Sequence, residues 1–223
     1  MTWSEVAFVA LVVVLVLVWS VWVAATRLDR LHRKVGASRS ALENQLVRRA
    51  SVAAEIAATG VLDPVSSVLV ADAAWSALAV GGHGASDLIA LVPDLAAEAR
   101  RVGPGPDAPS PGEASHAPAG AAERESAESE LSRTLRTALD DPSEVAAILE
   151  EPLGAELLEA LAAAWYRVEL ARRFHNEAVA QAQRMRHTAL VRLLRLHGHA
   201  PMPRTVEIDD GWPDGLPRPG HAA

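Results

Sequence analysis

The chain has 223 residues, half of them hydrophobic, and a formal net charge of −7. It contains no cysteine, which excludes a disulfide framework, a thiol nucleophile and a zinc site built on cysteine. The acidic excess lies in residues 50–163, where nineteen acidic side chains outnumber five basic ones. Such an acidic body does not favour nucleic acid as a partner, because a protein that binds phosphates presents a basic surface.

Residues 6–25 form one apolar run that contains neither a charge nor a proline. In a helix, with a rise of about 1.5 Å per residue, this run spans roughly the 30 Å hydrocarbon core of a bilayer. A single span must be helical, because lipid offers no other partner for its backbone groups. Trp3, Trp19 and Trp22 lie near the two edges of the run, as is typical of the headgroup level. The sequence therefore predicts a transmembrane helix over residues 6–25 after a short head of residues 1–5.

The charges that flank this run predict its orientation. Glu5 is the only charged side chain before it, whereas a basic cluster follows it directly. The cluster consists of Arg27, Arg30, Arg33 and Lys34. Because segments rich in arginine and lysine stay in the cytoplasm, we expect the head outside and the rest of the chain inside.

A cleaved signal peptide is the competing interpretation of the same run, because small residues occupy positions 23–25. Against cleavage stand the absence of a basic start, the length of the run and the arginines after it. All but one of the lysine and arginine residues are arginine, and alanine is abundant, which favours a bacterial coding bias. We therefore expect a single-pass protein of the bacterial plasma membrane. Its first partner is the lipid bilayer, whose anionic lipids attract the basic cluster.

Residues 26–102 are predicted to form the first helices of a cytoplasmic bundle. Apolar residues recur at helical spacing over 27–58, so this helix can continue from the membrane span without a break. Glycine, aspartate and proline then supply turn chemistry at 60–64, and a second helix is expected over 65–80. A third, short helix is expected near residues 87–101.

Residues 103–122 hold four glycines and five prolines but no large apolar side chain, which predicts a disordered insertion. Helical periodicity resumes over 123–139 and breaks at Asp141 and Pro142. Ser143 is then the expected N-cap of the next helix.

Residues 123–197 complete the predicted bundle. The longest helix is expected over 155–197, where an apolar stripe that includes Phe174 recurs about every 3.6 residues. Trp75 and Trp165 are expected in the bundle core. The tail, residues 198–223, is rich in proline and glycine and is expected to be flexible. The predicted fold class is all-α, with one N-terminal transmembrane helix followed by an antiparallel bundle of long helices.

Two short motifs carry a family resemblance. The run Gln45, Leu46, Val47, Arg48, Arg49 is similar to a Gln-Leu-x-Arg-Arg motif. The run 171–179, which includes Arg172 and Asn176, is similar to an Ala-Arg-x-x-Tyr-Asn-x-x-Val motif. Together with the layout of short head, single span and helical bundle, they resemble the LemA family of bacterial membrane proteins.

The resemblance covers residues 1–100 and 125–197 in outline and about fifteen residues in motif detail. His175 stands where that family has tyrosine, and a second Tyr-Asn pair and a Phe-Pro element are missing. The resemblance implies a cytoplasmic helical bundle and brings no established enzymatic activity.

Arg49 is the first candidate site residue, because it lies near the centre of an apolar helical arc, where an unpaired guanidinium is costly. Asp72 occupies the equivalent position on the second helix. A fold-back about residues 60–64 places the two at nearly equal height, which predicts an Arg49–Asp72 ion pair. We favour a structural pair that sets the helix register; a small polar pocket for an anion or a peptide carboxylate is the alternative.

The histidines and the last motif give weaker candidates. His175 is expected on the inward side of the last helix, as a buried neutral imidazole bonded to a neighbour rather than as a catalytic base. His197 and His199 lack a third ligand nearby, so a metal site is not favoured. Arg172 and Asn176 are expected on a solvated outer face that could also dock a partner.

The sequence shows neither an acid, base and nucleophile cluster nor a phosphate-binding loop, and no cofactor is expected. We favour a non-enzymatic, membrane-anchored scaffold for an unidentified cytoplasmic or membrane protein. An accessory or regulatory subunit of a membrane enzyme or transporter is the alternative, and a hydrolase with dispersed catalytic groups is a third. The apolar stripes could be satisfied within one chain or by pairing in a homo-oligomer.

Overall fold

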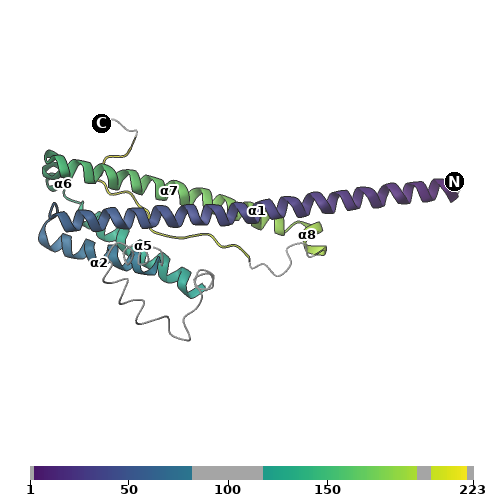
Figure 1. Ribbon diagram of the computed structural model, residues 1–223, viewed down its shortest axis with the longest axis horizontal. Coiled ribbons are helices and arrows are strands. Elements are labelled where there is room, and N and C mark those ends of the chain that lie inside the picture. The colour runs from purple at the N-terminus through teal and green to yellow at the C-terminus, as the bar shows by residue number, and fades with distance from the viewer. Residues whose placement is uncertain (1–2, 82–117, 195–201, 220–223) are drawn as a thin grey trace, which may run out of the picture. The chain divides into compact units, whose positions relative to one another are not determined.

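A computed structural model describes residues 3–81, 118–194 and 202–219 (Figure 1). These residues form six helices and no β-strand, so the all-helical prediction is confirmed. The helix predicted over 87–101 and most of the insertion predicted over 103–122 lie outside the described residues. The helices are α1 (Trp3–Thr59), α2 (Pro64–Val80), α5 (Pro118–Ala138), α6 (Pro142–Glu150), α7 (Pro152–Arg186) and α8 (Ala189–Leu193).

Helix α1 runs for 57 residues without a break. Among the described residues it is the one helix long and apolar enough to cross a membrane, and none of its most apolar window is buried. Two hydroxyls near the end of the apolar run donate to the helix backbone, Ser20 to the carbonyl of Val16 and Thr26 to that of Trp22, both at 2.8 Å. These polar side chains therefore need no solvent partner.

The chain divides into two compact units, which are described separately. Unit 1 comprises residues 1–40 and 173–205, and unit 2 comprises residues 41–172 and 206–223.

The turns of unit 2 form where the sequence places its turn residues. Gly60 ends α1 with a φ of 70°, a left-handed conformation that glycine adopts without a Cβ penalty. The carboxylate of Asp63 then accepts from the backbone N–H groups of Val65 and Ser66 and caps α2. At α6 the cap is Asp141 and not Ser143 as predicted, because its carboxylate accepts from the Ser143 N–H at 2.8 Å.

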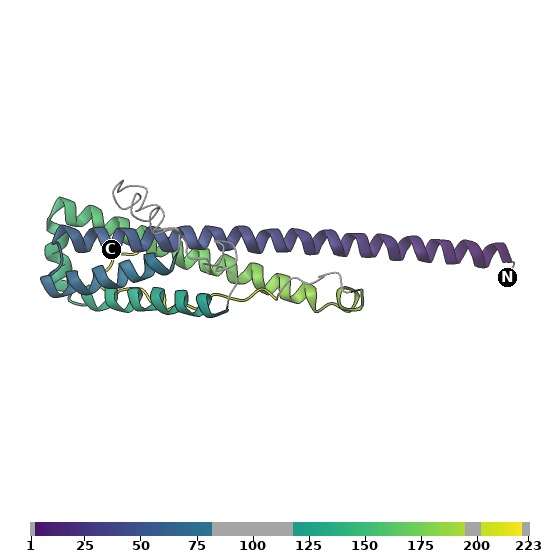
Figure 2. The ribbon, with the colours of Figure 1, turned by 60° about the horizontal axis from the view of Figure 1, so that its bottom comes forward.

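The core of unit 2 combines alanines on α1 and α2 with large apolar side chains, most of them on α1, α5 and α7. Alanines on α1 and α2 let the backbones approach closely, and α2 lies beside α5 (Figure 2). Trp165 is fully buried, as predicted. The larger buried side chains are Leu42, Leu46, Ile56, Leu131, Leu135, Leu139, Leu158 and Leu161.

Trp75 corrects the prediction for α2, because its side chain is half exposed and not part of the core. Helix α2 is apolar nearly all round, so the periodicity of its sequence did not identify the inward face. The inward face carries Ala73, Ala74 and Ala77 instead, which allows closer helix packing than an indole would.

The long last helix predicted over 155–197 is shorter and broken. Helix α7 ends at Arg186, and α8 begins at Ala189. Between them the Thr188 hydroxyl and backbone N–H both donate to the Met185 carbonyl, at 2.8 and 3.2 Å, which closes a tight turn. Phe174, predicted in the apolar stripe, is 61% exposed.

The tail predicted as flexible over 198–223 is ordered in part. Residues 206–219 belong to unit 2 and form no helix or strand, with a turn at 214–216, and we name them the C-terminal strap. Val206, Ile208 and Leu216 are buried, so the strap docks through apolar side chains at intervals. Its glycines and prolines indicated a linker, but a segment without regular secondary structure can dock through a few buried apolar side chains.

Candidate functional site

Helix α5 carries a polar stripe on its inward face. Arg124, Glu128 and Ser132 follow each other at intervals of four residues, which places them on one side of the helix. Glu128 and Ser132 are fully buried, and Arg124 is 6% exposed. A stripe of this kind must be paired internally, because burying an unpaired charge is costly.

Arg49, which α1 places opposite this stripe, is fully buried as expected. Its Nη2 lies 2.9 Å from Oε2 of Glu128 and also donates to the Glu128 carbonyl at 3.2 Å. Its Nη1 donates to the Ser132 hydroxyl at 3.0 Å. The Cζ atom lies 4.9 Å from the ring centroid of Trp165, within the range of a cation–π contact. The guanidinium is thus held by charge, hydrogen bonds and an aromatic face.

Arg49, Glu128 and Ser132 form a buried cluster, and Arg124 connects it to a second carboxylate, that of Glu43. The Nη2 of Arg124 lies 3.3 Å from Oε1 of Glu128 and 3.1 Å from Oε2 of Glu43. Its Nη1 donates to the Ala77 carbonyl in the last turn of α2, at 3.2 Å, where a positive charge complements the helix dipole. A Cβ on Gly81 would lie 2.0 Å from that Nη1, so glycine makes room for the guanidinium. Two arginines and two glutamates balance each other in the cluster.

The predicted Arg49–Asp72 ion pair is wrong, because Arg49 pairs with Glu128 and the side chain of Asp72 is exposed. The fold-back argument assigned Asp72 to the inward face of α2, whereas its side chain is exposed. With the alanines of α2 turned inward, Asp72 points to solvent, where its charge needs no partner.

The C-terminal strap is bound to unit 2 by two further ion pairs. Arg172 binds the Asp210 carboxylate through Nε at 2.8 Å, and the Nη1 of Arg136 binds Oδ1 of Asp209 at 2.7 Å. The Trp165 indole N–H donates to the Asp210 carbonyl at 3.1 Å. The hydrogen bonds from Arg136 lower the pKa of Asp209 and in return raise the pKa of the guanidinium.

The residues of the two motifs differ in how deeply they are buried. Leu46 is a core residue, Gln45 is half-buried and Arg48 is exposed. Asn176 is half-buried. Arg172 is not on a solvated face as expected, because its guanidinium is half-buried and paired with the strap.

His175 in unit 1 is buried, and its Nδ1 lies 3.1 Å from the Ser38 hydroxyl, so the predicted buried imidazole with a bonded neighbour is confirmed. The Ser38 hydroxyl also lies 2.9 Å from the Val35 carbonyl, to which it donates. A serine that gives its proton to a carbonyl is not activated as a nucleophile. His197 and His199 lie outside the described residues.

The buried cluster is arranged for stability rather than for chemistry. Ser132 donates its proton to the Glu128 carbonyl at 2.9 Å and accepts from Arg49, so its oxygen is neither deprotonated by a base nor open to a substrate. Each guanidinium meets a carboxylate within 3.3 Å. Such a paired centre holds the helices in one register.

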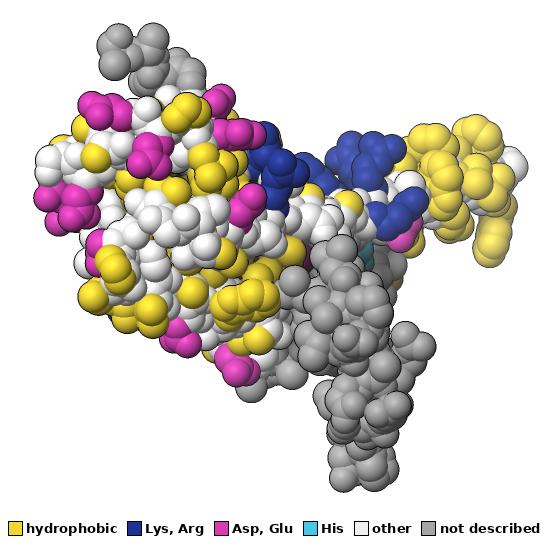
Figure 3. All heavy atoms as spheres, turned by 60° about the vertical axis from the view of Figure 1, so that its left-hand side comes forward, with side chains coloured by type: hydrophobic (Ala, Val, Ile, Leu, Met, Phe, Trp, Pro, Cys, Tyr) yellow, Lys and Arg dark blue, Asp and Glu magenta, His cyan; other side chains and the backbone are white. Residues whose placement is uncertain are grey.

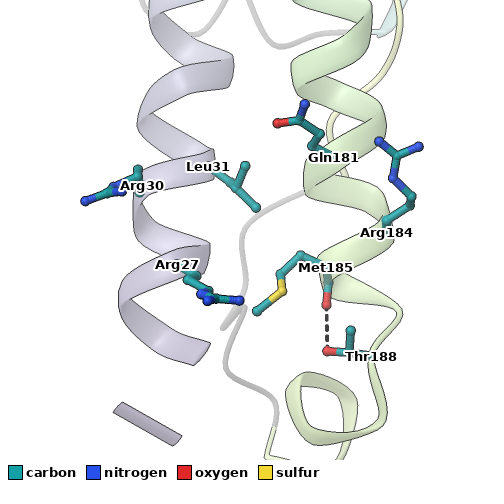
Figure 4. Close-up of a pocket in the computed structure, with 7 residues that line it drawn as sticks. All are labelled: Arg27, Arg30, Leu31, Gln181, Arg184, Met185 and Thr188. Carbon is teal, nitrogen blue, oxygen red and sulfur yellow. Dashed lines mark hydrogen bonds between the residues drawn. The ribbon is translucent and has the colours of Figure 1, made fainter. Parts of the chain in front are cut away.

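Unit 1 contains an open pocket of about 440 Å³ between the facing sides of α1 and α7 (Figure 4). Leu31, Gln181 and Met185 point into the gap, and the guanidinium of Arg27 extends toward Met185. The lining residues are Arg27, Arg30, Leu31, Gln181, Arg184, Met185 and Thr188.

Sequence reasoning missed Glu128, Asp210 and the pocket. For Glu128 the signal was its spacing of four residues from Arg124 and from Ser132, which places the three on one side of a helix that is polar on most sides. For Asp210 it was the alternation of Val206 and Ile208 just before two aspartates. For the pocket, the two sets of residues at spacings of three and four lie about 150 residues apart, so only the fold brings them together.

Comparison with known proteins does not assign either site. No family model matches the chain, no curated protein matches it and no solved structure matches it. The resemblance to the LemA family therefore depends only on the two motifs and on the layout of the chain.

Proposed function

We propose that this protein is a non-enzymatic scaffold, anchored in the bacterial plasma membrane by α1 and presenting an antiparallel helical bundle to the cytoplasm. The observation that carries the proposal is the continuity of α1. Its N-terminal part exposes an apolar surface that water does not favour, and its C-terminal part contributes buried residues to the core of unit 2. One helix thus serves as both anchor and bundle element.

The orientation follows from the basic side chains of unit 1. Figure 3 shows arginine and lysine side chains gathered directly after the apolar N-terminal segment. Such a cluster stays on the cytoplasmic side and is attracted by anionic lipid. Acidic side chains are spread over the surface of unit 2, which a negative membrane surface repels (Figure 3).

Carbonate extraction and protease protection test the anchor. Membranes washed with alkaline carbonate should retain the full chain, and a tag after residue 223 should resist protease until spheroplasts are lysed. A matched variant with Val13→Arg and Leu15→Arg should shift to the soluble fraction, because each central charge costs about 2.5–3.5 kcal/mol on insertion. Recovery of the unaltered chain in the soluble fraction would contradict anchoring, and digestion of the tag in intact spheroplasts would contradict the orientation.

The outer face of α2 supports the scaffold role. Four large apolar side chains on it are at least half exposed, with Val65 and Val68 at 69%, Leu69 at 56% and Trp75 at 50%. Val68 and Leu69 follow Val65 by three and four residues, and Trp75 follows Val68 by seven, so the four lie on one side of the helix. An exposed apolar stripe of this kind is typical of a protein interface.

A photo-crosslinking residue at Val68 tests this face in cells, with the same residue at the exposed Glu159 as the control. We expect a discrete adduct at Val68 that is absent at Glu159 and is lost when Trp75→Asp is introduced nearby. An adduct at twice the mass of the chain would assign the face to a second copy. The same adducts at both positions, or none at either, would contradict a docking role.

The LemA resemblance supports the same proposal through its arginines. Arg49 of the first motif pairs with Glu128, and Arg172 of the second pairs with Asp210. One arginine of each motif thus has a carboxylate partner within the chain, which favours a structural meaning of the motifs over a catalytic one.

A further inference from the structure

We propose that the pocket of unit 1 binds the phosphate of an anionic phospholipid at the cytoplasmic surface of the membrane. This inference rests on the proposed membrane anchoring and adds a defined lipid site to it. The pocket volume of about 440 Å³ lies within the range of small-ligand sites.

The pocket combines cationic side chains with an apolar floor. Leu31 of α1 and Gln181 and Met185 of α7 line the gap itself, and Thr188 follows the end of α7. Arg30 and Arg184 lie at the edges of the pocket and extend away from the gap (Figure 4). Figure 4 shows Leu31 and Met185 pointing into the gap, with the guanidinium of Arg27 beside Met185. Guanidinium groups bind phosphate oxygens in a bidentate manner, and the apolar floor suits the glycerol and first methylene groups of a lipid.

The charges around the pocket leave a positive excess. Arg27 and Arg30 are exposed and form no ion pair with any described residue. Arg184 lies 3.2 Å from Glu177, but this pair is exposed and weak, so a phosphate can compete for the guanidinium. Nearby, Asp29 is neutralised by Arg33, and Lys34 donates to Gln181 at 3.1 Å. An anion is therefore the favoured ligand.

The position of the pocket favours a lipid over a free anion. The apolar run ends at Ala25, and Arg27 follows two residues later, about 3 Å along the helix axis, which is the headgroup level for an inserted span. Thr188 lines the same pocket as Arg27, and α8 begins at the next residue. Leu193 and Leu194, at the end of α8, are 83% and 45% exposed, and apolar side chains at this level can enter the lipid.

Native mass spectrometry of the full chain in a neutral detergent tests the site. The probes are short-chain phosphatidylglycerol, phosphatidylcholine and inorganic phosphate. The pocket variant carries Arg27→Gln, Arg30→Gln and Arg184→Gln. The matched control carries Arg167→Gln, Arg173→Gln and Arg204→Gln, which removes three exposed arginines elsewhere. Circular dichroism should show equal helix content in both variants, because all six side chains are exposed.

We expect one phosphatidylglycerol per chain, bound about tenfold more weakly by the pocket variant and unchanged in the control. Equal binding of phosphatidylglycerol by the pocket variant and the wild type, or equal binding of phosphatidylcholine by the wild type, would overturn the proposal. Displacement of the lipid by an equal concentration of inorganic phosphate would assign the site to a free anion and would overturn it too. Because lipid binding is measured in detergent, it is independent of carbonate extraction. Loss of the lipid site therefore leaves the anchor supported, and release of the chain by carbonate leaves the lipid-binding result unchanged.

Discussion

In unit 2 the guanidinium of Arg49 is fully buried and meets Glu128, whereas in unit 1 the guanidiniums of Arg27 and Arg30 are exposed and meet no carboxylate of the described residues. A buried guanidinium cannot lose its proton, so its charge must be paired within the fold. An exposed one is hydrated and can exchange water for an external anion at little cost. The same residue type therefore fixes the helices in one unit and offers binding in the other.

The largest expected effect comes from breaking the buried cluster. Glu128→Ala leaves the charge of Arg49 buried without its carboxylate and should lower the free energy of unfolding by about 3–5 kcal/mol. Chemical denaturation followed by circular dichroism measures the loss. Glu130→Ala is the matched control on α5, because Glu130 forms an exposed pair with Arg133 and should cost below about 1 kcal/mol. Equal losses in both variants would contradict a structural role for the cluster.

Replacing both partners should recover most of that loss. Arg49→Met combined with Glu128→Leu removes both charges and fills the space with apolar atoms, which in other buried ion pairs is neutral or stabilising. We expect the double variant to unfold within about 2 kcal/mol of the wild type in the same denaturation assay. If the double variant is as unstable as Glu128→Ala alone, the unpaired charge of Arg49 is not the cause of the loss, and this explanation is contradicted.

A smaller effect is expected at the strap. Asp210→Ala removes the carboxylate that binds Arg172, a half-buried, charge-assisted contact, and should cost about 1–2 kcal/mol. Hydrogen exchange of residues 206–219 measures the release of the strap. Asp214→Ala, an exposed aspartate on the same segment, should leave this exchange unchanged.

Acid should weaken the strap at its second ion pair. The hydrogen bonds from Arg136 hold the pKa of Asp209 below its ordinary value. A lowered carboxyl pKa contributes stability above the ordinary pKa, and this stability is lost as the pH falls through the lowered value. The change should therefore lie below about pH 4. Trp212 fluorescence reports it, and Asp209→Asn should remove that pH dependence while leaving global unfolding in place.

The smallest effect is expected at Asp72. Because its side chain is exposed, Asp72→Ala should change the free energy of unfolding by less than about 0.5 kcal/mol. A loss comparable to that of Glu128→Ala would restore the ion pair that the sequence predicted and would contradict the pairing of Arg49 described above.

Local chemistry explains what the sequence predicted correctly. The unbroken α1, the turn at Gly60 and the start of α2 at Pro64 depend on periodicity, backbone freedom and capping, which act over a few residues. The burial of Arg49 was predictable for the same reason, since its neighbours in the helical arc are apolar.

Features that depend on tertiary packing could not be predicted from the sequence. The partner of Arg49 is 79 residues away, and Asp72 and Glu128 were equally available to it by charge. The inward face of α2 was ambiguous because nearly all of its residues are small or apolar. The strap has few apolar residues, and the alternation of Val206 and Ile208 is too short to show which segments they contact.

The strap also has a consequence for synthesis. Asp210 follows Trp165 by 45 residues, so at about 5–20 residues per second the ribosome adds it roughly 2–9 s later. Until Asp210 is added, the Trp165 indole N–H and the Arg172 guanidinium on the nascent chain lack the acceptors that they have in the folded protein. The last stage of translation therefore completes the polar contacts of helices that were made seconds before.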